Sequence, residues 1–295
     1  MVREDFAILI LSNRRPDRVF TVETLKKKGY TGKWYVVVDD EDPTLEEYKK
    51  RYDEEHLVIF SKKEAEAKFD MMDNLPERNV VVFARNMCPT IARRLGLHYF
   101  AEFDDDYKDF TYRVPDGKIL RAVAIPHDFD EVINAYIEFV ETVSASQPLF
   151  RTIAFAQSGE MLGGTHGSVW VAKYKRKAMN TFFFKVPDDP KDDVMFPGRI
   201  NEDVNAYIND GKTGGLWFQL ANINVNQLVT QYNKGGLTTA YKNLGTYVKS
   251  FYSVMLRPDS AKVAVLVTPG VKRIHHAINW ENTVPKIVDE KWKKK

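Results

Sequence analysis

Three consecutive carboxylates, Asp104, Asp105 and Asp106, directly follow an apolar segment at residues 98–103. In an extended backbone Asp104 and Asp106 point to one side and Asp105 to the other. Packing like charges this closely is costly unless a cation or a hydrogen-bond network compensates them. Mg²⁺ and Mn²⁺ take one or two carboxylates and complete their shells with phosphate oxygens and water. A solvated acidic turn is the alternative, but the position behind an apolar segment favours a metal site.

A second acidic pair, Glu202 and Asp203, opens a predicted helix at residues 201–208. Acidic residues are favoured at the start of any helix, because they satisfy free backbone N–H groups and complement the helix dipole. A helix N-cap is therefore one interpretation of this pair. The other is a functional carboxylate, and these residues alone leave both open.

A glycine-bearing loop at residues 158–167 lies between two predicted strands and contains Gly164 and His166. Glycines allow a backbone to approach a ligand closely, and His166 would then orient an acceptor. A hairpin loop uses the same composition, and a lone histidine is more often structural. Gly164 and His166 are therefore candidate acceptor-binding residues beside a structural alternative.

The first part of the chain alternates apolar runs with helical patterns. The predicted strands lie at residues 6–11, 34–38, 57–60 and 98–103, and the predicted helices at 19–28, 44–52 and 80–94. Such alternation predicts an α/β fold with a parallel sheet and right-handed crossovers. Ligands of such sheets bind at the carboxyl ends of the strands. The acidic residues 39–40 and 104–106 both fall at this edge.

The second part of the chain adds further elements. Strands are predicted at residues 119–125, 150–155, 168–174, 214–219 and 261–267, and helices at 128–144 and 201–208. No internal repeat and no Pro/Gly/Ser-rich linker separates the two parts. We therefore predict one domain over residues 1–295, with a nucleotide-binding half at 1–110 and an acceptor-binding half at 111–295.

Composition excludes several classes of protein. The 295 residues are 44% hydrophobic with a net charge of +2, which excludes a mainly disordered chain. A single cysteine, Cys88, excludes a disulfide scaffold and a cysteine-based zinc cluster. No apolar run approaches the roughly 18 residues of a membrane span, and none resembles a signal peptide. We therefore expect a cytoplasmic protein with no membrane partner.

Charge is unevenly distributed along the chain. From residue 240 to 295, eleven Lys or Arg residues oppose four acidic residues, so the body before them is acidic. A basic end suits a polyanionic partner. The alternative is that the lysines at 291–295 only keep the chain soluble.

Four motifs in order resemble a glycosyltransferase of the GT-A type: SNRRPDR after the first strand, VVDDED, ARN at a helix start, and FDDDY. The resemblance implies a mixed, mainly parallel central sheet flanked by helices, and a first half that holds a sugar nucleotide. It also implies that a DxD motif binds the diphosphate through Mn²⁺ or Mg²⁺. The matching metal ligands are Asp104 and Asp106, with Asp106 the more direct one. The matching donor-binding residues are Asn13, Arg14, Asp39, Asp40, Arg85, Asn86 and Asp104.

The same resemblance gives roles to the later motifs. The Asn-Glu-Asp sequence matches a motif whose carboxylate removes the proton from the acceptor hydroxyl, which implies Asp203 as general base and Glu202 as second choice. A late metal ligand in many such enzymes implies His275 or His276, although a structural histidine pair is the favoured alternative. Lys272 or Arg273 would then neutralise the leaving phosphates.

The segments 235–252 and 258–263 resemble more narrowly the phage and base-J-type transferases that glycosylate hydroxymethylpyrimidines in DNA. This implies acceptor-binding roles for Tyr247 and Lys249, in a region where Tyr241, Lys242 and Tyr252 also interleave aromatic and basic side chains. Tyrosines at this spacing are also common in protein cores. A phage-encoded chain would act in the host cytoplasm.

The combined expectation is a metal-dependent, inverting hexosyl- or pentosyltransferase. Its donor would be a nucleotide sugar, UDP-linked, and its acceptor 5-hydroxymethylcytosine or 5-hydroxymethyluracil in DNA. One alternative is a glycan, lipid or protein acceptor, and another is a non-catalytic DNA-binding module. A nucleotidyltransferase usually opens with a glycine-rich loop, which SNRRPDR lacks.

Overall fold

The computed structural model describes residues 1–161, 163–167, 174–175, 177–228, 246–268, 271–287 and 290. The predicted strand at 168–174 falls almost entirely outside these residues. Tyr241, Lys242 and the lysines at 291–295 lie outside them as well.

The four strands predicted in the first part of the chain are present and pair in parallel, in the order β3-β2-β1-β4. Their bounds are β1 (Phe6–Leu11), β2 (Lys33–Asp39), β3 (Leu57–Phe60) and β4 (Tyr99–Asp104). All six residues of β1 are buried, as expected for a strand covered on both faces. The carboxyl ends of β1, β2 and β4 meet at one edge of the sheet.

The sheet continues beyond β4 in the order β9-β7-β10-β5-β6, and β8 pairs with β10. The bounds are β5 (Tyr107–Asp116), β6 (Ile119–Ala124), β7 (Phe150–Gln157), β8 (Tyr174–Lys175), β9 (Phe182–Lys185) and β10 (Leu216–Gln227). Here β7 and β10 are parallel, whereas β9 is antiparallel to both its neighbours and β5 to β10 and β6. The sheet is therefore mixed, and most of its parallel pairings lie in the first part of the chain.

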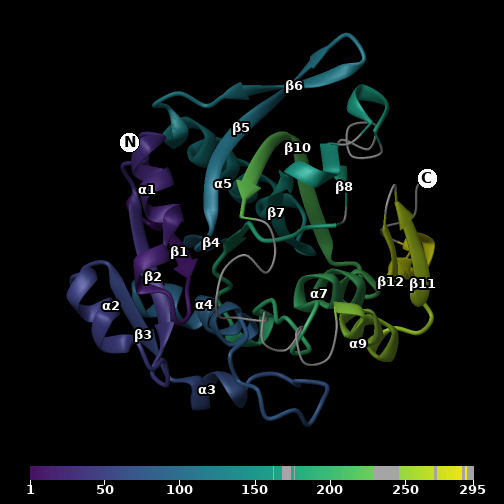
Figure 1. Cartoon of the computed structure of the whole chain (residues 1–295), viewed down its shortest axis with the longest axis horizontal. Coiled ribbons are helices and arrows are strands. Elements are labelled where there is room, and N and C mark those ends of the chain that lie inside the picture. The colour runs from purple at the N-terminus through teal and green to yellow at the C-terminus, as the bar shows by residue number, and fades with distance from the viewer. Residues whose placement is uncertain are drawn as a thin grey trace.

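Helices cover both faces of the sheet, which gives the flanked α/β architecture of the prediction (Figure 1). On one face the apolar core contains α1 (Phe20–Lys27) and α5 (Phe129–Ser146), and on the other α4 (Val82–Arg94) and α7 (Glu202–Gly211). Alternate residues of β1 contribute to the two cores. In the described residues, no helix has the length and apolar character needed to cross a bilayer.

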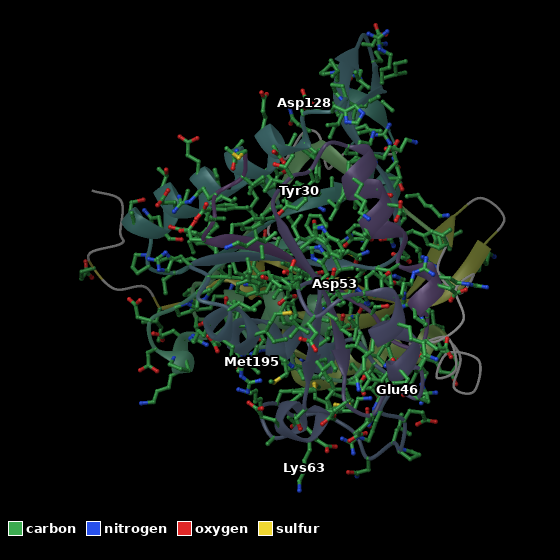
Figure 2. All side chains as sticks on the ribbon, turned by 90° about the vertical axis from the view of Figure 1, so that its left-hand side faces the viewer. Tyr30, Glu46, Asp53, Lys63, Asp128 and Met195 are labelled. Carbon is green, nitrogen blue, oxygen red and sulfur yellow. The ribbon has the colours of Figure 1, made fainter. Side chains whose placement is uncertain are left out.

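Shorter elements surround this body. Helices α2 (Leu45–Arg51) and α3 (Lys62–Glu66) follow β2 and β3, and Lys63 of α3 points away from the molecule in Figure 2. Near the C-terminus, α9 (Lys249–Leu256) precedes a separate antiparallel hairpin of β11 (Ala261–Thr268) and β12 (Val271–Ile278). The prediction for 261–267 is confirmed, but it missed β12, in which basic and histidine residues obscure the strand pattern.

Candidate active site

The middle acid of the turn after β4 has a structural role. Asp105 is buried, and its Oδ2 lies 2.7 Å from Arg15 Nε and accepts a hydrogen bond of 2.6 Å from Ser12 Oγ. Ser12 and Arg15 belong to the loop after β1, so Asp105 fixes this loop against the turn. Burial raises the pKa of Asp105 to about 6, although Arg15 opposes the shift.

Asp104 shares a buried cation with two other carboxylates. Arg85 Nη2 lies 2.9 Å from Asp104 Oδ1, Nη1 lies 3.3 Å from Glu102 Oε2, and Nε lies 3.2 Å from Glu202 Oε1. Burial raises the pKa of Glu102 to about 8, against the effect of Arg85. One guanidinium therefore compensates three acids from β4 and α7, and the group as a whole stays acid-rich. We call Arg85, Glu102, Asp104 and Glu202 the carboxylate cluster.

Asp106 is the acid of the turn that forms no ion pair with a described side chain, although the charge of Arg15 acts on it from a distance. Its half-buried carboxylate makes no hydrogen bond or ion pair with any other side chain in the described part of the chain. Burial and repulsion from Asp104 and Asp105 raise its pKa to about 7. A hard divalent cation would relieve this repulsion, so the donor set of Asp104 and Asp106 fits Mg²⁺ or Mn²⁺.

His275 and His276 do not join Asp104 and Asp106 in a group that could hold a metal ion. Across the described ranges, no three His, Cys, Asp or Glu side chains gather closely enough to hold a metal ion. An ion on Asp104 and Asp106 would therefore draw its other ligands from phosphate and water, as Mg²⁺ commonly does.

A small pocket of about 40 Å³ lies close to this turn. It lies at the carboxyl ends of β1 and β2 and is lined by Asn13 and Asp39 together with the apolar side chains of Phe60 and Phe83. Asn13 Nδ2 donates to Asp39 Oδ2 over 2.9 Å, and the buried Lys62 Nζ lies 2.9 Å from Asp39 Oδ1. The structure thus brings Asn13 and Asp39 together as the sequence predicts.

Three other predicted donor residues have different surroundings. Asp40 accepts a 2.9 Å hydrogen bond from the backbone N–H of Lys62 and so holds the start of α3. Arg14 is exposed in the left-handed conformation, with φ of 57°. Asn86 is buried, and both polar atoms of its amide bond the backbone of Phe196, at 2.9 and 2.8 Å. We therefore assign Asn86 to holding the loop before α7 rather than to the donor.

Glu202 and Asp203 form the first turn of α7, where their roles diverge. Glu202 contacts Arg85, whereas Asp203 accepts a 2.7 Å hydrogen bond from the backbone N–H of Val204. Burial raises the pKa of Asp203, and Arg85, Lys177 and Lys249 oppose this shift through their charges. The N-cap residue of α7 is Asn201, whose side chain makes no capping hydrogen bond, so Asp203 is a first-turn acid within electrostatic range of two lysines rather than the N-cap.

His275 and His276 of β12 lie near Asn201, the residue that precedes α7. His276 Nδ1 lies 3.5 Å from Asn201 Nδ2, and the rings of His275 and His276 are 4.3 Å apart. Burial and the neighbouring cations lower the pKa of both, that of His276 to about 3, so both are neutral near pH 7. The histidines therefore lie beside α7, and their predicted metal role has no support in the ligand geometry.

Two predicted acceptor residues lie elsewhere. Gly164 belongs to the 3₁₀ turn η3 (Gly164–His166), where an added Cβ would come within 2.2 Å of the Lys118 carbonyl oxygen. This glycine therefore allows a close approach to the β5–β6 hairpin, which favours the structural alternative. His166 is exposed on the same turn.

The remaining candidates lie around α9 and β12. Lys249 is the first residue of α9 and lies within electrostatic range of Asp203, whereas Tyr247 is exposed and packs edge-on against Phe251. Lys272 is exposed on β12 and has no described contact with the carboxylate cluster. Arg273, rather than Lys272, lies within range of Lys249.

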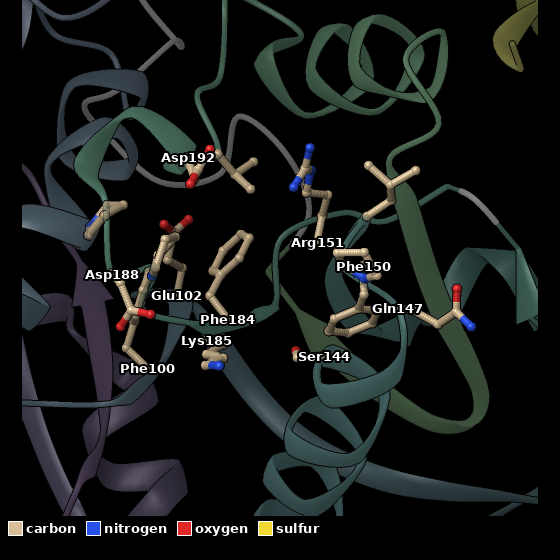
Figure 3. Close-up of a pocket in the computed structure, with 15 residues that line it drawn as sticks. Phe100, Glu102, Ser144, Gln147, Phe150, Arg151, Phe184, Lys185, Asp188 and Asp192 are labelled. Atoms are coloured by element: carbon tan, nitrogen blue, oxygen red, sulfur yellow. The ribbon is translucent and has the colours of Figure 1, made fainter. Parts of the chain in front are cut away.

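A separate cavity of about 420 Å³ lies at the amino ends of β4 and β7 (Figure 3). Phe100, Phe150 and Phe184 form its walls, and Glu102 is the member of the carboxylate cluster that reaches it. Because the Asp104–Asp106 turn lies at the opposite end of β4, this cavity is not the candidate active site.

Comparison with known families decides the identity. The model of the TET-associated glycosyltransferase family matches residues 6–236. The chain belongs to this family. It is a glycosyltransferase, and every carboxylate of the candidate site lies within the matched segment.

Solved structures share a more distant likeness with this glycosyltransferase. Glucosyl-3-phosphoglycerate synthase from Mycobacterium tuberculosis with Mn²⁺ and UDP-glucose is 8% identical, with a TM-score of 0.46 over 92% of this chain and 86% of that one. Its complex with Mg²⁺ and UDP is 9% identical, with a TM-score of 0.42 over 92% and 87%. S. aureus TarS 1–349 is 10% identical, with a TM-score of 0.40 over 86% and 65%. No curated protein matches the chain.

Sequence reasoning missed several residues of this glycosyltransferase's site: Glu102, Arg15, Lys62 and Lys177. Glu102 had a detectable signal, since a glutamate inside an apolar strand needs a buried cation. Lys177 had none, because the fold alone brings it near Asp203.

Proposed function

We propose that this protein transfers a hexose or pentose from a UDP-sugar to the hydroxymethyl group of a modified pyrimidine in DNA, with inversion at the sugar carbon. The observation that carries the proposal is the Asp106 carboxylate, which forms no ion pair with a described side chain, on a turn whose Asp105 contacts Ser12 and Arg15 in the wall of the Asn13–Asp39 pocket. An acid-rich turn next to a pocket lined by Asn13 and Asp39 suits a diphosphate that arrives with a divalent cation.

The donor side would bind the nucleotide through the pocket and the turn. Asp104 and Asp106 would hold Mn²⁺ or Mg²⁺, which when bound neutralises negative charge on the leaving diphosphate. Arg15 and Ser12 keep Asp105 in place and so hold the turn that carries Asp104 and Asp106. The ion pair with Arg85 orients the carboxylate of Asp104.

The acceptor side would supply the general base. Asp203 takes the proton of the hydroxymethyl group while that oxygen bonds to the sugar carbon and the carbon–diphosphate bond breaks. An alcohol needs such assistance to be a competent nucleophile. Glu202 is held by Arg85 and positions α7, which leaves Asp203 as the base.

Support for a DNA acceptor comes from two sources. The family description ties these transferases to TET, and hydroxymethyl bases left by TET oxidation would carry the required alcohol. In addition, the positive charges of Lys177 and Lys249 act on Asp203, and Arg273 lies near Lys249, which suits phosphates next to the reacting base.

The test is an acceptor and donor panel. The protein is incubated with Mn²⁺, several UDP-sugars and oligonucleotides that contain 5-hydroxymethylcytosine or 5-hydroxymethyluracil, and products are weighed by mass spectrometry. We expect one added sugar per hydroxymethyl base, and none with EDTA or on the unmodified oligonucleotide. Transfer to a glycan, lipid or protein instead would contradict the proposed acceptor.

A further inference from the structure

The β11–β12 hairpin projects beside α9 and is separate from the main sheet (Figure 1). An isolated two-stranded hairpin is only marginally stable in water. This one nevertheless exposes large apolar side chains, among them Val265 at 65% and Val267 at 64%. Leu266 and Ile274 are exposed as well. Such a concentration of exposed apolar side chains indicates an interaction surface.

The charge of the hairpin points to a polyanion. The sequence from Ser260 to Trp280 contains no Asp or Glu. Lys272 pairs with Val267, and Arg273 with Leu266, so basic and apolar side chains lie together in the outer half of the hairpin.

A second copy of the chain fits this surface less well. Pairing of two hairpins through β12 would place Lys272 and Arg273 of both copies on one ribbon. Like charges across a strand pair are destabilising. A partner that is itself negatively charged removes this penalty.

The hairpin also lies next to the candidate base. Helix α9 begins at Lys249 and packs against both β11 and β12. Positive charge therefore extends from Lys249, beside Asp203, to Arg273 on the hairpin. The family match ends at residue 236, so this hairpin lies beyond the matched segment.

We propose that the β11–β12 hairpin enters a groove of duplex DNA beside the acceptor base. The inference rests on the proposed function, since it takes DNA as the acceptor. The major groove, about 12 Å wide, admits a two-stranded ribbon, and apolar side chains contact thymine methyl groups there. Each eight-residue strand spans about 27 Å, close to eight base pairs at about 3.4 Å each. A single strand offers no groove, so duplex DNA binds more tightly.

Binding of unmodified DNA tests this inference without any transfer reaction. Fluorescence anisotropy with a 20-base-pair duplex and the matching single strand is measured across a range of salt concentrations. We expect wild type to prefer the duplex. The double variant Lys272→Gln with Arg273→Gln should lower the salt slope by about 2, because each phosphate contact contributes about 0.9.

A second double variant tests the apolar face. Val265→Ser with Val267→Ser should weaken duplex binding by about tenfold, the size of a good base contact, and leave both the salt slope and single-strand binding unchanged. Lys63→Gln, an exposed lysine on α3, is the matched control and should change neither affinity. Circular dichroism checks that all variants are folded.

The outcomes separate the hairpin from the proposed function. Duplex binding that both hairpin variants weaken, together with no transfer to any hydroxymethylated oligonucleotide, supports the inference and contradicts the proposed acceptor. Equal binding of single and double strands, or unchanged affinity in both hairpin variants, overturns the inference. A dimer that the valine variant alone dissociates also overturns it.

Discussion

The two sides of the candidate site carry opposite excess charge. On the donor side, Arg85 faces three carboxylates, and Asp106 forms no ion pair with any described side chain. On the acceptor side, Lys177 and Lys249 lie within electrostatic range of one acid, Asp203, and Arg273 lies within range of Lys249. The difference indicates that the donor side is complementary to a cation-bound diphosphate and the acceptor side to an anion.

Loss of the base should produce the largest effect. Asp203→Asn keeps the shape of the side chain and its bond from Val204 but cannot accept a proton, so kcat should fall by about 10²–10⁴-fold. Steady-state kinetics with a hydroxymethylated duplex measures this. UDP-sugar binding should be unchanged, because Asp203 is assigned to the acceptor side. A variant with full activity would remove Asp203 from the mechanism.

The second-largest effect should come from removal of Arg85, the cation shared by the carboxylate cluster, which should destabilise the donor side. Arg85→Met leaves buried Glu102 and Glu202 without a partner, which should cost about 3–5 kcal/mol of unfolding free energy. Urea denaturation measures this loss. The matched control is Arg94→Met, whose guanidinium is exposed and contacts only Glu64 among the described residues. Equal stability of the two variants would show that the carboxylate cluster is not held by Arg85.

Asp106→Asn should separate catalysis from stability. Transfer should fall by about 10²–10³-fold, whereas the melting temperature without metal should stay the same or rise, because repulsion from Asp104 and Asp105 is relieved. The stabilisation that wild type gains from Mn²⁺ with UDP should disappear. Asp105→Asn is the contrasting variant, since it loses Arg15 and Ser12 and should melt earlier. A metal response retained in Asp106→Asn would contradict the assignment.

Acid should affect the buried carboxylates and His276 in opposite directions, and this effect on stability should be the smallest of the four. Asp106 and Glu102 have a raised pKa from burial, so the folded state binds protons more tightly and these groups gain stability as pH falls from about 8 toward 4. His276 has a pKa lowered to about 3 by burial and by His275, so its contribution is lost as pH falls below about 6.5.

Comparison of wild type and His276→Asn isolates the histidine contribution. At pH 5 the variant should lose less stability than wild type, by about 1 kcal/mol after allowance for solvent screening. Hydrogen exchange at pH 7.5 and 5.5 should locate the weakening in α9 and β12. An identical pH response in both proteins would contradict burial of a neutral His276.

Strands with continuous apolar runs were predictable, because burial on both faces leaves a clear pattern in β1 and β2. The strands β5, β9 and β12 were not, since polar, short or basic strands are set by their neighbours in the sheet. In the site, Asp104 and Asp106 could be placed from their position after β4. The structural roles of Asn86 and Gly164 could not be predicted, because they depend on the backbone of Phe196 and Lys118, which are distant in the sequence.

The guanidinium of Arg85 contacts Asp104 of β4 and Glu202 of α7 at the same time. Any ligand that draws Asp104 away changes the electrostatic field at Glu202 and at its neighbour Asp203. Binding of the sugar nucleotide would therefore change the electrostatic field at Asp203, the proton acceptor, before the acceptor alcohol binds. Such coupling favours a compulsory order of association, with the donor first.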